Sequence, residues 1–330
     1  MRKRLTFVVP IVPFLMMAAC SDETNEPIQN EEAVDIEPEP EQQEDLENED
    51  TEVEEIEIED ADHSESEQEA GPIHDEMFVD APFLLHTDVN FLDNVSNEVM
   101  MVDIERTEEE IARADQFLLS LQQSDTTQND IFSAIDETSM DEGNALLYFS
   151  FDGPMSMAST ESAIFLDKLH YTADMYGIET LFFFEDGEPG AMFGELAEME
   201  AEDVEVTPNL GYYVYEQDGD STFARIADIE DIDENQDFNE TLEAMQTVTA
   251  HEEHFQPGIS NLVTIHDAWT DDEGTAQVHY AVTDPESWND EDENAFFKAL
   301  QLTALDFGAE RLRLVDEENE EIIDYRLLEE

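Results

Sequence analysis

The chain has only one cysteine, Cys20, among its 330 residues. A lone cysteine cannot form an internal disulfide, so any exported domain of this chain must be held together by core packing alone. The sequence also lacks a Gly-x-Ser-x-Gly motif and a His-Glu-x-x-His motif, which are local signatures of serine hydrolases and zinc peptidases. These absences predict a protein that is not an enzyme and has no catalytic, cofactor-binding or metal-binding residues.

Basic residues are also scarce. Lysine and arginine together number 11 against 89 aspartates and glutamates, which gives a net charge of -78. Residues 77–330 alone carry 63 acidic residues and 8 basic ones. Binding to nucleic acid is excluded, because contacts with phosphates require lysine and arginine. The composition suits a halophilic source, since molar salt shortens the electrostatic screening length to about 3 Å.

The N-terminal segment lacks an apolar stretch of transmembrane length. Residues 5–17 are apolar but include Pro10 and Pro13, and three basic residues precede them, which is the pattern of a signal peptide over residues 1–20. The segment ends in Met-Ala-Ala-Cys and resembles a bacterial lipobox. The resemblance implies cleavage before Cys20, acylation of Cys20, and a lipid anchor on the extracytoplasmic face of the cell membrane. The alternative is an ordinary secretory peptide with a free or buried Cys20.

The next segment, residues 21–76, contains 26 acidic residues but no lysine, arginine or aromatic residue. Such a composition cannot bury enough apolar surface to offset the entropy of ordering, and its like charges extend the chain. We therefore predict a disordered acidic linker between the lipid and the folded part. An arm that binds metal ions or a partner is the alternative.

The rest of the sequence contains an internal repeat. Residues 141–188 align without a gap with residues 272–319, at an offset of 131 and with thirteen identities in forty-eight positions. Most of the shared residues are apolar or turn residues: Asp141/Asp272, Glu142/Glu273, Gly143/Gly274, Ala145/Ala276, Pro154/Pro285, Ser156/Ser287, Phe165/Phe296, Leu169/Leu300, Thr172/Thr303, Ala173/Ala304, Gly177/Gly308, Glu179/Glu310 and Leu181/Leu312. A repeat of this kind identifies the building unit of the fold, so we expect one domain over residues 77–200 and a second over 201–330.

The secondary structure expected from apolar spacing is similar in the two copies. In the first copy, strands are predicted at residues 81–86, 98–104, 130–135, 144–151 and 181–184, and helices at 107–122 and 160–176. Thr107 and Glu110 are expected to form a capping box at the first helix. In the second copy, the expected elements are strands at 211–216, 222–229, 261–266, 275–282 and 312–315, a helix at 239–250, and a helix that carries Phe296 and Leu300. The predicted fold class is α/β (α+β): a tandem repeat of two small sheet-plus-two-helix domains of the same topology, preceded by a disordered linker.

This pattern resembles the GerMN domain of sporulation and spore germination proteins. In both copies a strand (Leu-Tyr-Phe-Ser at 147–150, Val-His-Tyr-Ala at 278–281) precedes a helix that opens on an acidic residue, Glu161 or Asp292. The helix then runs through Leu-x-x-Thr-Ala to Tyr176-Gly177 or to Phe307-Gly308. A turn with Gly187 follows only in the first copy. The resemblance implies two tandem GerMN-like domains in an envelope lipoprotein, and it implies no catalytic residue.

Three groups of residues could indicate a functional site. His251 and His254 enclose two glutamates, but a chance surface cluster is favoured over a metal site. The acids Asp267, Asp271, Asp272 and Glu273, with Asp141 and Glu142, have the composition of a calcium loop without its spacing, so hairpin turns are favoured. The third group, the phenylalanines at 182–184, is interpreted as core, with a docking face between the domains as the alternative.

These observations favour a non-catalytic, lipid-anchored extracytoplasmic protein. We expect its tandem domains to bind a protein or cell-wall partner in sporulation, germination or envelope signalling, and we expect membrane lipid to be reached only through acylated Cys20. One alternative is a hydrolase of peptidoglycan or another glycan that uses carboxylates between the domains. A third hypothesis is a substrate-binding lipoprotein of a transporter.

Overall fold

The computed structural model describes residues 75–90, 99–125, 131–141, 143–150, 159–193, 198–205, 211–217, 220–225, 236–249 and 251–328. The predicted signal peptide, Cys20, most of the predicted linker and Glu142 lie outside these residues. Residues 67–330 belong to one unit of the chain, and only this unit is described below. Within its described parts, no helix is long and apolar enough to cross a membrane.

The first copy folds around one sheet, with strand order β4-β5-β6-β7 and β8 beside β6. Strands β4 and β5 form an antiparallel hairpin, β5 and β6 are parallel, and α2 connects β5 to β6. Strands β7 and β8 both run antiparallel to β6. The elements are β4 (Ile135–Asp141), β5 (Asn144–Phe149), α2 (Ser159–Met175), β6 (Thr180–Glu185), β7 (Glu188–Pro189) and β8 (Ala201–Asp203).

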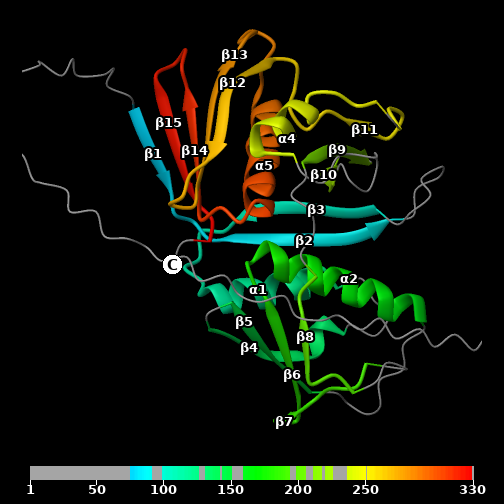
Figure 1. Ribbon diagram of the computed structural model, residues 1–330. Coiled ribbons are helices and arrows are strands. Elements are labelled where there is room, and N and C mark those ends of the chain that lie inside the picture. Colours follow the sequence, from blue (N-terminus) through cyan, green and yellow to red (C-terminus); the bar gives the residue numbers. More distant parts are fainter. Residues whose placement is uncertain are drawn as a thin grey trace, which may run out of the picture. The chain divides into compact units, whose positions relative to one another are not determined.

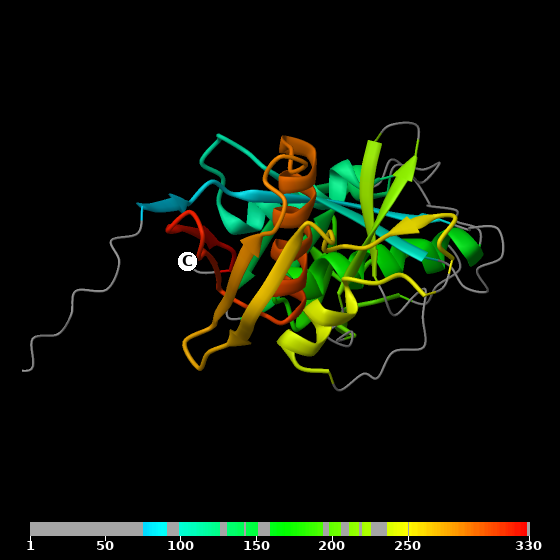
Figure 2. The same cartoon turned by 90° about the horizontal axis from the view of Figure 1, so that it is seen from above.

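The second copy repeats this topology with the strand order β12-β13-β14-β15. Again the first pair is antiparallel, the second is parallel across a helix, and the third is antiparallel. Helix α5 lies on one face of this sheet (Figure 2). The elements are β12 (Val263–Thr270), β13 (Thr275–Val282), α5 (Asp290–Asp306), β14 (Arg311–Asp316) and β15 (Glu321–Arg326).

The parallel strand pairs at the centre of the two sheets have the same register. Ala145 pairs with Leu181 in the first copy, and the residues 131 positions later, Ala276 and Leu312, pair in the second. Both hairpins also have a register shift, after Ile135 and after Ile265, but their turns differ in length: Asp141 pairs with Asn144, whereas Thr270 pairs with Ala276. Because a one-residue slip would turn every side chain of a strand to the other face, register is a strict test. The predicted tandem repeat with a common topology is therefore confirmed.

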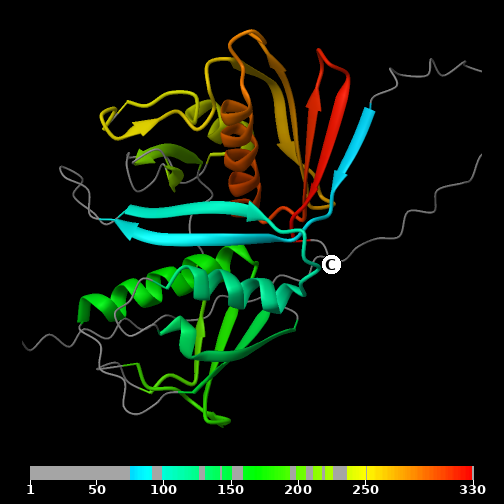
Figure 3. The same cartoon turned by 180° about the vertical axis from the view of Figure 1, so that it is seen from behind.

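A third sheet joins the two copies. Strands β2 (Phe83–Asn90) and β3 (Val99–Arg106) of the first copy and β9 (Tyr212–Gln217) and β10 (Asp220–Arg225) of the second form the order β11-β9-β10-β3-β2, where β11 is Phe255–Gln256. The copies meet where β3 and β10 pair antiparallel, with Val102 opposite Phe223. Helix α1 (Arg113–Gln123) and α2 pack on β2, while α5 packs on β3 and β9 (Figures 1 and 3). The sheet is thus covered by helices of both copies.

Two short strands, β1 (Asp75–Val79) and β8, pair with the sheet of the other copy. Strand β1 begins in the predicted linker and pairs in parallel with β15 at the edge of the second sheet. Conversely, β8 lies beyond residue 200 but belongs to the sheet of the first copy. On β1, the side chains of Met77 and Phe78 are 53% and 64% exposed. The two copies therefore share strands as well as a sheet.

Some sequence predictions were wrong in detail. The capping box at Thr107 does not form: α1 begins six residues later at Arg113, after an Ala112 without a side-chain cap, and the Thr107 hydroxyl instead accepts from the amide of Glu109. Residues 110–112 line a pocket instead of forming a helical turn, so the tertiary structure overrides the local signal. Residues 132–134 form a 3-10 turn and the strand follows it. Strand β15 was missed, and α4 (Phe238–Ala244) ends before the predicted residue 250.

Six of the thirteen pairs that the copies share are buried in both copies. Five apolar pairs of the repeat are at most 1% exposed: Ala145/Ala276, Phe165/Phe296, Leu169/Leu300, Ala173/Ala304 and Leu181/Leu312. Gly177 and Gly308 follow the helices with φ of 63° and 66°, a backbone region that L side chains avoid. The duplication has thus preserved packing and chain turns.

The phenylalanine run in β6 follows strand alternation. Phe183 is fully buried with Leu181, as the core interpretation predicted. Phe184 points to the other face of the sheet and stacks on Tyr148 of the neighbouring strand, with ring centroids 4.9 Å apart. Its partner therefore belongs to the same copy, and the structure gives no support to a docking face between domains at this position.

Candidate functional site

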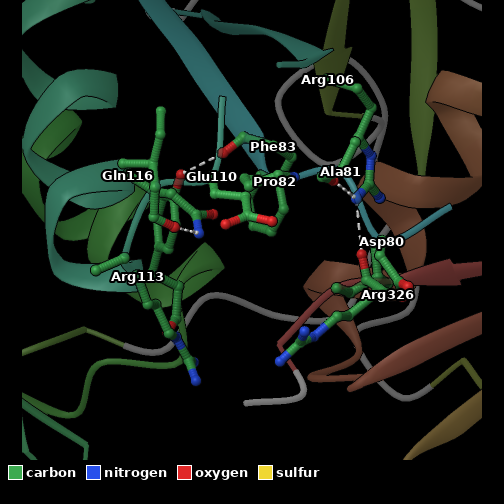
Figure 4. Close-up of a pocket in the computed structure, with 13 residues that line it drawn as sticks. Asp80, Ala81, Pro82, Phe83, Arg106, Glu110, Arg113, Gln116 and Arg326 are labelled. Carbon is green, nitrogen blue, oxygen red and sulfur yellow. Dashed lines mark hydrogen bonds between the residues drawn. The ribbon is translucent and has the colours of Figure 1, made fainter. Parts of the chain in front are cut away.

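The candidate site is a pocket of about 660 Å³ at the junction of the two copies. Its walls come from the start of β2, the end of β3, the segment before α1, and the chain that follows β15. The close-up in Figure 4 shows these groups around the opening. The lining residues are Asp80, Ala81, Pro82, Phe83, Arg106, Glu110, Ile111, Ala112, Arg113, Gln116, Tyr176, Arg326 and Leu327.

Arg106, the last residue of β3, crosses from the first copy to the second. Its Nε and Nη2 atoms donate to Oε1 of Gln301 on α5, at 2.9 and 2.7 Å. Its Nη1 donates to the carbonyl oxygens of Ala81 and Arg326, both at 2.7 Å. The guanidinium also lies 5.6 Å from the ring centroid of Phe83 and 5.4 Å from that of Tyr325. Burial lowers the pKa of Arg106 to about 10, so the group is still charged at neutral pH.

Arg113 binds the end of the described chain to the first copy. From the first turn of α1, its Nη1 donates to the carbonyl oxygen of Leu328 at 2.9 Å, and its Nη2 donates to that of Tyr176 at 2.6 Å. The Tyr176 ring stacks on Phe83 with centroids 5.0 Å apart, and its hydroxyl donates to the Phe83 carbonyl. Burial raises the pKa of Tyr176, so the phenol stays neutral.

The charge of the pocket differs from that of the rest of the protein. Arg106, Arg113 and Arg326 line it together with only two carboxylates, Asp80 and Glu110. Over residues 77–330, by contrast, 63 acidic residues face 8 basic ones. Three of those eight cations thus gather at one cavity, and the hydrogen bonds of Arg106 are all with uncharged oxygens. A cavity with these walls is suited to an anion.

Further contacts hold the two copies together. Lys298 on α5 forms an ion pair with both carboxylate oxygens of Asp103 on β3, at 2.8 and 2.9 Å. The hydroxyls of Tyr171 on α2 and Tyr212 on β9 are 2.9 Å apart in the interior. Arg225 lies over the Tyr171 ring at 5.7 Å. These contacts join the two copies to each other, although none of these side chains lines the pocket.

Of the acids of the calcium-like group, Asp271, Asp272 and Glu273 lie in a hairpin turn, as predicted. Oδ1 of Asp271 accepts from the amides of Glu273 and Thr275 in the turn between β12 and β13. These backbone hydrogen bonds, above all that from Thr275, lower the pKa of Asp271. Asp267 instead lies within β12, and Asp141 ends β4. A turn therefore accounts for the carboxylate of Asp271 without a metal ion.

The predicted histidine pair lies in a tight turn. His251 has a positive φ of 57°, and the amide of His254 donates to its carbonyl oxygen. The Nε2 atom of His254 lies 3.9 Å from the Oε1 atom of Glu253. Throughout the described ranges, no three histidine, cysteine, aspartate or glutamate side chains come together in a way that could hold a metal ion.

A different pair of histidines meets on the sheet of the second copy. Nδ1 of His266 and Nδ1 of His279 lie 2.7 and 3.2 Å from the two carboxylate oxygens of Glu317. Trp269 stacks on the His279 ring, with centroids 5.3 Å apart. Sequence analysis missed this group because His266 and Glu317 are 51 positions apart. Only the pairing of β12, β13 and β14 brings them together.

The contacts with the two histidines predict a lowered pKa for the Glu317 carboxyl group. The hydrogen bonds from His266 and then His279 lower the pKa of Glu317 below its usual 4.5. A carboxyl group whose folded pKa is lowered stabilises the fold above its unfolded pKa, and it loses this contribution as the pH falls through the folded pKa. In an NMR titration, we expect the Glu317 carboxyl midpoint below 4.5, with a return toward 4.5 in the His266→Ala, His279→Ala double variant. An equal midpoint in both proteins would contradict the contact.

Comparison with known proteins gives little further information. No family model matches the chain, and no curated protein matches it. Among solved structures, it is similar to the tandem GerMN domains of the sporulation protein GerM from Bacillus subtilis, with 12% sequence identity and a TM-score of 0.35. The similarity covers 74% of this chain and 97% of that one. At such a TM-score the fold assignment rests on the strand registers described above.

Proposed function

We propose that the chain is a non-catalytic, lipid-anchored protein of the extracytoplasmic envelope whose two GerMN-like copies bind a protein or cell-wall partner. The proposal rests on the kinds of residue that the two copies have in common. The identities of the repeat are core residues such as Phe165/Phe296 and turn residues such as Gly177/Gly308. An enzyme that acted through both copies would be expected to repeat its polar catalytic groups. A duplicated scaffold is suited to presenting a surface.

The location is supported by the sequence. The lipobox-like residues that end at Cys20, followed by an acidic linker, favour export and acylation. The envelope role in sporulation, germination or signalling is supported by the resemblance of the strand, helix and glycine-turn motifs to GerMN domains. The junction pocket supports binding, because it is concave, combines apolar with charged walls, and is held by contacts between both copies.

Anchoring is tested by fractionating cells that express either the full-length chain or its Cys20→Ala variant. We expect the parent chain in the membrane fraction and labelled by a fatty-acid probe, because two or more acyl chains bind a membrane stably. The variant is expected in the non-membrane fraction without label. Equal membrane recovery of both chains at high salt would contradict the lipid anchor.

Partner binding is tested by chemical crosslinking in intact cells. The full-length chain is compared with a chain cut after residue 76, which keeps the anchor and the linker. We expect discrete crosslinked species only with the full-length chain. If both chains gave the same species, the partner would not be bound by the two copies and this part of the proposal would fail.

A carboxylate pair in the same pocket keeps the hydrolase alternative testable. Asp80 and Glu110 both line the junction, and glycosidases act through two carboxyl groups. Release of soluble fragments from purified cell walls by the full-length chain, abolished by Glu110→Gln, would replace the binding proposal with an enzymatic one. We expect no release, because arginines outnumber carboxylates in the lining.

A further inference from the structure

We propose that the junction pocket binds a peptide-like ligand through a free carboxylate flanked by an apolar group. The inference rests on the proposed binding function and names the class of ligand. It is drawn from the pocket itself: three arginines, apolar walls, and a location that only the fusion of the two copies creates.

The arginines determine the sign of the ligand. A guanidinium presents a planar set of donors that matches a carboxylate, and such charge-assisted hydrogen bonds are about twice as strong as neutral ones. Arg106 supplies charge to the pocket from a buried position where its donors are engaged by Gln301 and two carbonyl oxygens. Arg326, the last residue of β15, brings its side chain to the pocket wall, where Figure 4 shows it across the opening from Arg113.

The rest of the protein limits how many charges the ligand can carry. The folded part has 63 acidic and 8 basic residues, so a polyanion such as a nucleic acid is repelled everywhere outside the pocket. A ligand with one carboxylate avoids most of this repulsion.

The apolar walls determine what lies next to the charge. Ala81, Pro82, Phe83, Ile111 and Leu327 form one part of the lining. A pocket of about 660 Å³ is also larger than an inorganic phosphate or a chloride ion needs, and it falls in the range of ordinary small-ligand sites. Apolar walls beside arginines fit an amphipathic carboxylate, as at the end of a peptide with an apolar last residue. Capture of a terminal carboxylate is a known mode of peptide recognition.

The N-terminus of α1 also favours an anion in the pocket. The residue before the helix, Ala112, lines the pocket and has no side chain that caps the first turn. The first amides of a helix carry a partial positive charge that favours an anion. This contribution is secondary to the arginines, but it has the same sign and reaches the same cavity.

The test is isothermal titration calorimetry on the full-length chain in detergent, with the peptide acetyl-Ala-Ala-Leu as probe. We expect the free acid to bind and the C-terminal amide to bind at least tenfold more weakly, since a charged hydrogen bond contributes about 1.5–3 kcal/mol. Inorganic phosphate is expected not to displace the peptide. Equal affinity for acid and amide, or displacement by equimolar phosphate, would overturn the assignment.

The matched variants are Arg326→Gln and Arg311→Gln. Arg311 is the cross-strand neighbour of Arg326 but does not line the pocket. The main-chain contact of Arg326 with Arg106 involves the carbonyl oxygen, so it survives the substitution. We expect Arg326→Gln to weaken binding of the acid about tenfold or more, and Arg311→Gln to leave it unchanged. If both substitutions weakened binding equally, the effect would come from the overall charge of the protein, and the pocket would be rejected as the binding site.

Failure of the peptide site can be distinguished from failure of the proposed function. If the peptide bound but crosslinking found no partner, the pocket would be retained and the partner role rejected. If crosslinked species were found and were unaffected by Arg326→Gln, the partner role would stand and the pocket would be rejected as its binding site.

Discussion

Replacing Arg106 by alanine is expected to lower the free energy of unfolding by about 3 kcal/mol, the largest loss for any single polar group of the junction. The substitution leaves the carbonyl oxygens of Ala81 and Arg326 and the Gln301 amide oxygen without their donor. It also removes a cation that lies between the Phe83 and Tyr325 rings. The relief of an unfavourably buried charge offsets part of this loss, which is why the expected value is below the sum of four charged hydrogen bonds.

The measurement is urea unfolding, because urea is uncharged whereas guanidinium chloride is itself a salt and would screen the same charges. A double-mutant cycle with Gln301→Ala tests the contact directly. We expect a coupling energy of about 1–2 kcal/mol between Arg106 and Gln301, as found for groups that share hydrogen bonds. Arg106→Lys should lie between the parent and Arg106→Ala, because lysine keeps the charge but loses the planar donor set. Strict additivity of the two alanine substitutions would disprove the contact.

The second expected result concerns the matched core residues Phe165 and Phe296. Both are at most 1% exposed and occupy equivalent positions on α2 and α5. Substitution of either by alanine should cost about 3–5 kcal/mol, the usual loss for a buried phenylalanine. Because the copies share the β3–β10 pairing and the Lys298–Asp103 ion pair, each variant should unfold in one transition that is shifted as a whole.

Two independent domains would behave differently. Each substitution would then shift only the transition of its own copy and leave the other at the parent midpoint. Urea unfolding followed both by tryptophan fluorescence and by far-ultraviolet circular dichroism distinguishes these cases, since Trp269 and Trp288 are both in the second copy. Coincident curves for Phe165→Ala by the two probes are expected. A fluorescence transition unaffected by Phe165→Ala would show that the copies unfold separately.

Much of each copy was predictable because the relevant signals are local. Helix α2 was expected at residues 160–176 and is found at Ser159–Met175, and strand β13 was expected and found at residues 275–282. Apolar residues at helical or alternate spacing and a glycine at the helix end determine such elements over a few turns. The failed capping box at Thr107 shows the limit of this argument. There, the residues that would have formed the first turn line the junction pocket instead.

The site itself was not predictable from one sequence. Arg106 is separated from Gln301 by 195 positions and from Arg326 by 220, and nothing near it in sequence marks it as part of a cavity. Of the groups that were noticeable in the sequence, the run His251–His254 and the acids Asp271–Glu273 lie in turns. A scarcity of cations was the one useful signal: with eight in the folded part, each deserved a structural explanation, and three of them line the pocket.

The sequence alone determined the composition of the protein, its duplication and the elements within each copy, because charge, periodicity and turn residues act over short stretches of chain. Only the tertiary structure decided that β3 pairs with β10, that β1 joins the sheet of β15, and that a basic pocket forms between the copies. The physical reason is that strand edges carry backbone donors and acceptors that are alike in every strand. Which edges meet depends on the packing of the whole chain, which no local pattern records.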